Sequence, residues 1–221
     1  MTRESHPLRA TFRNLPGDKR EKVLAAALHE FARNDYAAAN LDRIAAAAGV
    51  PKGSLYQYFG SKESLYALVL SEGLERALTL FEASLRRRPP ADAFALFRSA
   101  LVFALALFEK SPDLAWIYLR VGYLPATAQR ETVLPRLREM GRSFTDRLLD
   151  MGIAEGSIDP AVDRPAAAFL LDALSQRFHE TVLLAGSVGK PTRKARERLA
   201  DALVDLARRA LAPSRTERRA P

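Results

Sequence analysis

The chain has 221 residues, 48% of them hydrophobic, with a formal net charge of +8 and a sequence pI near 10.0. This length and composition allow a buried core in one large domain or two modest ones, and the positive charge favours an anionic partner. Cysteine is absent, which excludes a disulfide framework, a thiolate nucleophile and a Cys-based zinc site.

Residues 1–17 predict a mobile N-terminal arm, because Arg3, Arg9 and Arg13 lie among polar and proline residues. The arm either touches phosphates or has no specific role. It contains no apolar signal core, and the longest uninterrupted apolar run of the chain, Leu101–Phe108, is far below the roughly 18 residues that a membrane span needs. We therefore expect a cytoplasmic protein with no membrane partner.

Two helices are expected within residues 18–48. Asp18 followed by Glu21 is typical of a capping box at the start of the first helix. Apolar residues then recur at helical spacing, at Leu24, Ala27, Leu28 and Phe31. After a loop, Asn40 is expected to cap the second helix, and Gly49 to end it. The apolar stripe of that helix consists of Leu41, Ile44, Ala45 and Ala48.

A short third helix is expected after Pro51, whose missing N–H suits a first helical turn. Leu55 and Phe59 lie four residues apart and are expected to face the core. The opposite face carries small and amide residues flanked by two phenols, namely Gly53, Ser54 and Gln57 between Tyr56 and Tyr58. Such a face suits a DNA groove with a phosphate wall on either side, so residues 18–65 predict a helix-turn-helix DNA-binding domain.

The segment from Asp18 to Leu70, and above all GVPKGSLYQYFGSKESLY, resembles the TetR/AcrR-type transcriptional regulators. The resemblance implies DNA contacts by Lys52, Ser54, Tyr56, Gln57 and Tyr58, a phosphate contact by Lys62, and presentation of the second helix to the DNA backbone by Asn40. Asp35 stands where the family usually has glycine, and we expect the turn there to survive. Ser54 and Gln57 replace commoner residues, so the operator sequence cannot be copied from relatives.

Beyond Leu70 the pattern stays helical, which predicts an all-α fold. We expect a long helix over 61–85 to join the DNA-binding domain to a helical effector-binding and dimerisation domain, residues 66–212, and a tail over 213–221. The further helices are expected over 92–110, from 111 to about 123, around 137–148 with Pro135 as a kink or in the first turn, from 163 past 182, and over 192–211. The basic runs at 193–198 and 214–219 are interpreted as a solvated face and a frayed end, with a second DNA site as the alternative.

The last two long helices carry broad apolar stripes, which either complete a monomeric core or form an association surface. The resemblance to TetR/AcrR-type regulators implies an association surface. In those regulators the two helices form a four-helix homodimer interface, which places two DNA-binding domains on a two-fold-related operator of double-stranded DNA. The residues predicted for this interface are Leu174, Phe178, Leu199, Leu203 and Leu206.

Aromatic residues of the second domain are candidates for an effector site, although each also fits an ordinary core position. The candidates are Phe103, Phe108, Trp116, Tyr123, Phe144, Phe178 and His179. The resemblance implies an effector held among these helices, and the apolar set predicts a small hydrophobic ligand. His179 and Gln176 are candidates for polar contacts with this ligand, or they form hydrogen bonds within the core or across the dimer.

An enzyme and a protein-binding adaptor are the competing classes. The histidines, His6, His29 and His179, form no base-plus-nucleophile set, metal-ligand spacing is missing, and Gly186–Lys190 lacks the glycine spacing of a phosphate loop. An adaptor would not explain the outward face of the third helix. We expect a homodimeric repressor, without cofactor or metal, that a small hydrophobic effector releases. The alternative is an activator, or a regulator of the same fold controlled by a partner or without a ligand.

Overall fold

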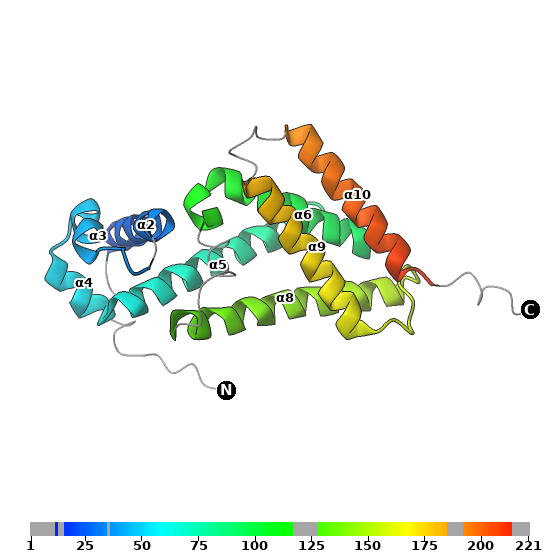
Figure 1. Ribbon diagram of the computed structural model, residues 1–221, viewed down its shortest axis with the longest axis horizontal. Helices are drawn as coiled ribbons and strands as arrows, with labels where there is room; N and C mark the ends of the chain where they lie inside the picture. Colours follow the sequence, from blue (N-terminus) through cyan, green and yellow to red (C-terminus); the bar gives the residue numbers. More distant parts are fainter. Residues whose placement is uncertain (1–11, 13–15, 35, 117–127, 185–191, 214–221) are drawn as a thin grey trace, which may run out of the picture. The chain divides into compact units, whose positions relative to one another are not determined.

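The computed structural model describes residues 12, 16–34, 36–116, 128–184 and 192–213, and the regular elements within these ranges are α-helices (Figure 1). They are α2 (Gly17–Arg33), α3 (Leu41–Ala48), α4 (Lys52–Phe59), α5 (Lys62–Arg87), α6 (Ala93–Lys110), α8 (Ala128–Ala154), α9 (Arg164–Leu184) and α10 (Arg193–Leu211). Residues 112–116 are also helical. The predicted all-α fold is confirmed.

The chain divides into two compact units. Unit 1 comprises Met1–Ala77 and Ser111–Leu134, and unit 2 comprises Leu78–Lys110 and Pro135–Pro221. Helix α5 therefore begins in unit 1 and ends in unit 2. No helix of the described ranges is both long and apolar enough to span a bilayer.

Unit 1 is built on helix α3, which packs against both α2 and α4. Of the predicted apolar stripes, Ala27, Ile44 and Leu55 are fully buried, whereas Leu24 and Leu28 are half-buried. Val23 and Leu65, which lie outside the predicted stripes, complete this core. Aromatic rings close one side of this core, where Tyr66 meets Phe31 edge-on with ring centroids 4.9 Å apart. Because short helices are marginal alone, this shared core is what stabilises α3 and α4.

The ends of these helices test the predicted capping residues. Asn40 caps α3 through a bond from the Asp42 N–H, and Gly49 ends that helix at φ 66°, a left-handed conformation that favours glycine. The predicted capping box of α2 is wrong. That helix begins at Gly17 after Pro16, which makes no side-chain cap bond. Asp18 therefore lies inside the first turn, and Glu21 bonds Arg76 of α5 at 2.6 Å instead.

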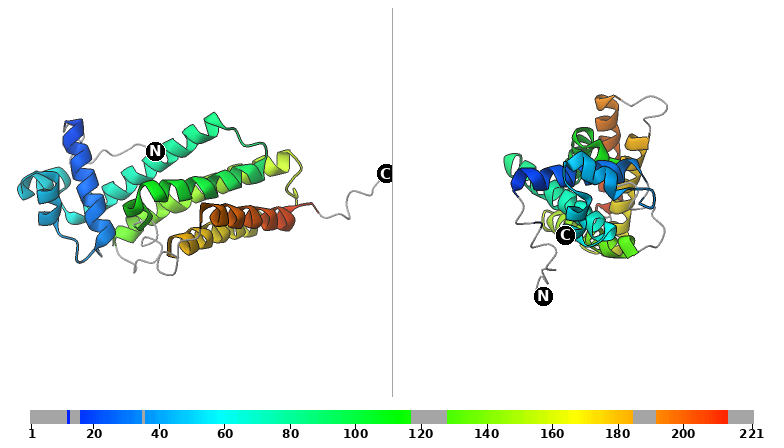
Figure 2. Two further views of the ribbon diagram at one scale, coloured as in Figure 1. Left: turned by 90° about the horizontal axis from the view of Figure 1, so that it is seen from above. Right: turned by 90° about the vertical axis from the view of Figure 1, so that its left-hand side faces the viewer.

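Unit 2 has its core between α6, α9 and α10, which contact one another (Figure 2). Helix α6 buries Phe94, Phe97 and Leu101 in this core. Helix α10 adds Ala200, Val204, Ala207 and Leu211 to the same core. Thr192 caps α10, because its hydroxyl accepts a bond from the Ala195 N–H at 3.2 Å.

Helix α8 also belongs mainly to unit 2, and it contributes Leu148 and Leu149 to the core. It begins at Ala128, so Pro135 lies inside the helix and not in its first turn. Asp163 caps α9, because its carboxylate accepts the Ala166 N–H at 3.0 Å. Trp116 belongs to unit 1, and Tyr123 lies outside the described residues.

Candidate nucleic-acid interface

Helix α4 is held by one apolar side and two glycine-containing turns. Leu55 and Phe59 are buried, as their spacing predicts, and the Phe59 ring lies 4.9 Å from that of Phe12. Gly60 ends the helix with φ 72°. These contacts fix which face of α4 points away from the core of unit 1.

The outward face of α4 presents the residues that the sequence singles out. Gly53 and Gln57 are exposed, Tyr56 is 48% exposed, and Ser54 and Tyr58 are half-buried. A Cβ added at Gly53 would meet no atom within 4 Å. The helix backbone at this point is therefore open to close approach by a partner.

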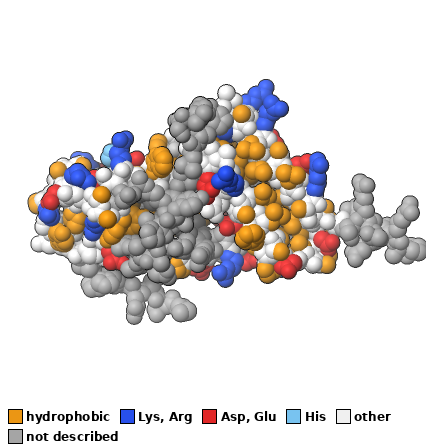
Figure 3. All heavy atoms as spheres, in the orientation of Figure 1, with side chains coloured by type: hydrophobic (Ala, Val, Ile, Leu, Met, Phe, Trp, Pro, Cys, Tyr) orange, Lys and Arg blue, Asp and Glu red, His pale blue; other side chains and the backbone are white. Residues whose placement is uncertain are grey.

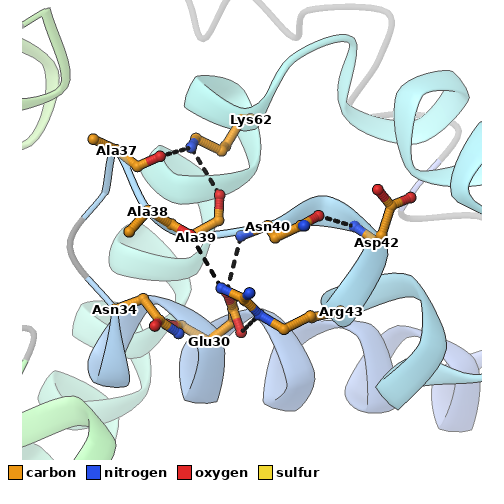
Figure 4. Close-up of polar contacts among 9 residues, drawn as sticks. All are labelled: Glu30, Asn34, Ala37, Ala38, Ala39, Asn40, Asp42, Arg43 and Lys62. Atoms are coloured by element: carbon orange, nitrogen blue, oxygen red, sulfur yellow. Dashed lines mark hydrogen bonds and ion pairs between the residues drawn. The ribbon is translucent and has the colours of Figure 1, made fainter.

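The N-terminus of α3 lies in a network of polar contacts (Figure 4). The Asn40 side-chain oxygen accepts the Asp42 N–H at 2.7 Å, and the Asn40 N–H donates to the Glu30 carboxylate at 2.8 Å. Arg43 Nε donates to both oxygens of that carboxylate at 3.0 and 3.1 Å. Glu30 on α2 thus fixes both the cap and the first turn of α3.

Sequence reasoning missed Glu30, although a signal was present. It lies three residues after Ala27 and beside Phe31, on the apolar stripe of α2, and only 8% of its surface is exposed. An acid on a buried stripe requires a partner. The bond from Arg43 and that from the Asn40 N–H lower the pKa of the Glu30 carboxyl, although burial opposes them.

The cations of this surface each have a partner within unit 1. Lys52 at the start of α4 forms an ion pair with Asp42 of α3 at 2.8 Å, and this bond raises the pKa of Lys52. Both side chains are about half exposed. Lys62 donates to the carbonyls of Ala37 and Ala39 at 3.1 and 2.8 Å, and its ammonium lies 4.8 Å from the centroid of the Tyr36 ring.

The candidate effector residues of unit 2 fall into two groups. In the first group, the ring centroid of Phe81 of α5 lies 5.1 Å from that of Phe103 and 6.0 Å from that of Phe144. His179 meets Phe108 edge-on at 5.7 Å and lies 5.5 Å from Phe178. Sequence analysis did not include Phe81, the residue that joins the first group.

His179 is buried, and that burial lowers the pKa of its imidazole to about 4. Its ring is therefore neutral at pH 7, which fits a surrounding of aromatic rings. No group of three or more His, Cys, Asp or Glu among the described residues is arranged to hold a metal ion.

An apolar surface covers α9 and α10 on the face shown in Figure 3. Phe169 is 76% exposed and Leu206 57% exposed, and Leu199 is exposed as well. Of the other residues predicted for the dimer interface, Leu174 and Leu203 are half-buried, whereas Phe178 is buried in the core of unit 2. Helix α10 thus has one apolar side in the core and another at the surface.

Helices α3 and α4, joined by a short turn and presenting a polar outward face, define a helix-turn-helix DNA-binding protein. The sequence model described as bacterial regulatory proteins, tetR family, matches residues 23–69. The HTH-type transcriptional repressor SCO4008 of Streptomyces coelicolor is 42% identical over 163 residues, which cover 72% of this chain and 78% of that protein. The chain belongs to the TetR family of transcriptional regulators, which are DNA-binding proteins and not enzymes.

Two further similarities cover most of the chain. The uncharacterized HTH-type transcriptional regulator YuxN of Bacillus subtilis is 26% identical over 180 residues, and the matched region is 80% of this chain but 60% of that protein. The crystal structure of the transcriptional regulator FadR from Bacillus subtilis, in complex with stearoyl-CoA, has a TM-score of 0.73 at 19% identity. The match covers 85% of this chain and 96% of the FadR chain, which shows that the two share a fold.

Proposed function

We propose that this chain is a homodimeric repressor that binds a palindromic operator through α3 and α4 and leaves it when a small hydrophobic effector binds unit 2. The outward face of α4 carries the proposal, because its polar residues are exposed while Leu55 and Phe59 fix the helix from behind. Repression is proposed by analogy with SCO4008, a transcriptional repressor. An activator, or a regulator that responds to a partner or to no ligand, is the alternative.

Within this proposal, Gln57 reads a base edge and the residues around it position the helix. The proposed positioning contacts come from Asn40, Lys52, Gly53, Ser54, Tyr56 and Tyr58. An amide side chain can bond adenine through two atoms, and such a pair contributes about 1–3 kcal/mol of discrimination. Phosphate contacts lack this sequence information.

Selection of bound duplexes from a random pool tests the DNA half of the proposal, because a two-fold dimer should enrich a palindrome. Gln57→Ala should then weaken binding to the selected site by about 1–3 kcal/mol and flatten its preference at one position. Ser143→Ala, at an exposed position on α8, is the control. Equal losses on selected and random duplexes would remove Gln57 from the reading face.

The homodimer is supported by the apolar surface of α9 and α10. On α10, the exposed residues Ala195, Leu199, Ala202, Leu206 and Ala210 recur at intervals of three or four, separate from the side that faces the core. A regular apolar stripe of this kind fits the facing helix of a second copy. Leu174 and Leu203 are proposed to line the same interface, and the buried Phe178 to support it from within.

Charge insertion tests this interface. Leu206→Glu should give a folded monomer with weak operator binding, since an unpaired charge in an apolar interface costs several kcal/mol. Leu80→Glu is the matched control, because Leu80 on α5 is 51% exposed and Leu206 is 57% exposed. Light scattering and circular dichroism report the mass and the helical content. A wild-type protein that is monomeric at micromolar concentration would contradict the proposal.

The effector is proposed to lie among the aromatic residues of unit 2. Phe103, Phe108 and Phe144 offer apolar contacts, Phe178 supports them, and His179 adds a polar ring that is neutral at pH 7. Trp116, which belongs to unit 1, and Tyr123, which lies outside the described residues, are candidates from the sequence alone. FadR, which shares the fold, binds stearoyl-CoA in its crystal structure, and a hydrophobic or amphipathic ligand fits this lining.

Stearoyl-CoA and free stearate are suitable probes. A ligand that binds the native state alone raises the melting temperature, and at one hundred times its Kd it stabilises the fold by about 2.7 kcal/mol. Coupling to DNA of about 1–3 kcal/mol would lower operator affinity roughly five- to 150-fold. If neither probe nor any planar aromatic compound changes the melting temperature or operator binding, the effector half of the proposal fails and the DNA half stands.

A further inference from the structure

The connection between α2 and α3 is held from both sides by charged groups of unit 1. The carbonyls of Ala37 and Ala39 accept the Lys62 ammonium, and the carbonyl between them, that of Ala38, accepts Arg43 at 3.0 Å. The next backbone N–H, that of Asn40, donates to Glu30. Four consecutive residues thus have a backbone group bonded to a charged side chain, which fixes where α3 begins (Figure 4).

Lys62 makes this connection over a long distance in the sequence. It lies in the first turn of α5, 23 residues after Ala39 and 25 after Ala37, and its bond to Ala39 is partly buried. An ammonium has three N–H donors, of which the two carbonyls take two. The Tyr36 ring lies against the same nitrogen at 4.8 Å, within the range of a cation–π contact.

We propose that Lys62 is a positioning residue of the DNA interface, which holds the Ala37–Ala39 connection and through it Asn40 and α3, and is not a phosphate contact. The proposal rests on the function proposed above and replaces the role that the family resemblance implies for Lys62. While both carbonyl bonds hold, one N–H donor of Lys62 is left for a phosphate, and binding phosphate through more than one donor would require Lys62 to leave Ala37 or Ala39. Loop carbonyls left without a partner would then need water.

Lys62→Met separates the two roles, because it keeps the approximate length of the side chain and removes its charge and donors. For a positioning residue, operator affinity falls roughly tenfold while the slope of log K against log salt stays unchanged. For a phosphate-binding residue, the slope falls by about 0.9 for each phosphate that the variant no longer neutralises. Lys52→Met is the matched control, since Lys52 is exposed at the N-terminus of α4 and its removal should lower the slope.

Hydrogen exchange on the free protein gives a second measure that needs no DNA. In Lys62→Met, the amides of Asn40, Asp42 and Ile44 should exchange roughly tenfold faster, because their bonds depend on the position of the connection. The amides within α10 should not change. If Lys62→Met does not fold, Lys62→Gln, which retains two N–H donors and no charge, is used instead.

A fall of about 0.9 in the salt slope of Lys62→Met, or unchanged hydrogen exchange at Asn40 and Asp42 in that variant, would overturn the proposal. Failure of the wild-type protein to select any duplex would instead contradict the proposed function. The exchange measurement would still decide whether Lys62 fixes the connection. The two failures are therefore distinguishable.

Discussion

Replacing Glu30 tests how the start of α3 is stabilised. Glu30→Gln keeps the size of the side chain, but an amide has one acceptor oxygen where the carboxylate has two. The Asn40 N–H and Arg43 both donate to Oε1, and Arg43 Nε donates to Oε2 as well, so an amide that keeps its oxygen at the Oε1 position sets its NH₂ against Arg43 Nε. Loss of a hydrogen bond to a charged group costs about 1.5–3 kcal/mol. We expect the free energy of unfolding to fall by about 2 kcal/mol at pH 7.

For a chain of this length, that loss lowers the melting temperature by about 4–8 °C. Urea unfolding followed by the fluorescence of Trp116, the sole tryptophan, reports on unit 1, and circular dichroism reports on the whole chain. Glu139→Gln is the control, because Glu139 on α8 is exposed. Operator affinity should fall in Glu30→Gln as well, since the Asn40 cap loses its fixed position.

The dependence on pH gives the sharper test. The pKa of Glu30 is lowered in the folded state, so its charged form is favoured by folding. This stabilisation is complete above the unfolded-state pKa of about 4.3 and is lost as pH falls through the lower folded-state value. The difference between wild type and Glu30→Gln should therefore shrink below about pH 4.3. Equal stability of the two proteins at pH 7, or a constant difference at all pH values, would refute the reasoning.

Three other substitutions test single features of the two units. Asp42→Asn should strengthen binding to selected and random duplexes alike and steepen the salt slope, because it removes an anion and frees Lys52; gel-shift titrations at several salt concentrations measure both. Gly152→Ala should cost about 1–3 kcal/mol in urea unfolding, since the added Cβ would lie 2.3 Å from Cδ1 of the buried Ile158. His179→Leu should make stability less dependent on pH between 6.5 and about 4. In the wild type the folded-state pKa of His179 is about 4, below its unfolded value, so protonation in this range favours unfolding and stability falls as the pH is lowered. Thermal melts across this range measure the difference.

Local patterns predicted the helices of unit 1 well, and long-range partners escaped them. Leu55 and Phe59 face the core because a four-residue spacing returns to the same side of any helix. Asn40 caps α3 through a bond two residues away, which the sequence contains in full. By contrast, the Arg43–Glu30 pair spans 13 residues and two helices, so no periodicity could reveal it.

The same limit applies where a prediction failed. Asp18 and Glu21 match a capping box, but Glu21 bonds Arg76, which lies 55 residues away. A tertiary ion pair thus competes with a local cap, and the single sequence does not show which is formed. In unit 2, Phe81 joins Phe103 and Phe144 from a helix that sequence analysis treated as a linker.

The placement of charge also shows why composition alone describes this interface poorly. From α3 to the first turn of α5 the cations are Arg43, Lys52 and Lys62. The first two pair with Glu30 and Asp42, and Lys62 bonds backbone carbonyls. A cation paired in the free protein gains less from phosphate, because it must lose one partner to acquire another. The net charge of +8 therefore exceeds the charge that α3 and α4 can offer to DNA, and the proposed recognition there relies on the polar face of α4 and on the geometry that holds it.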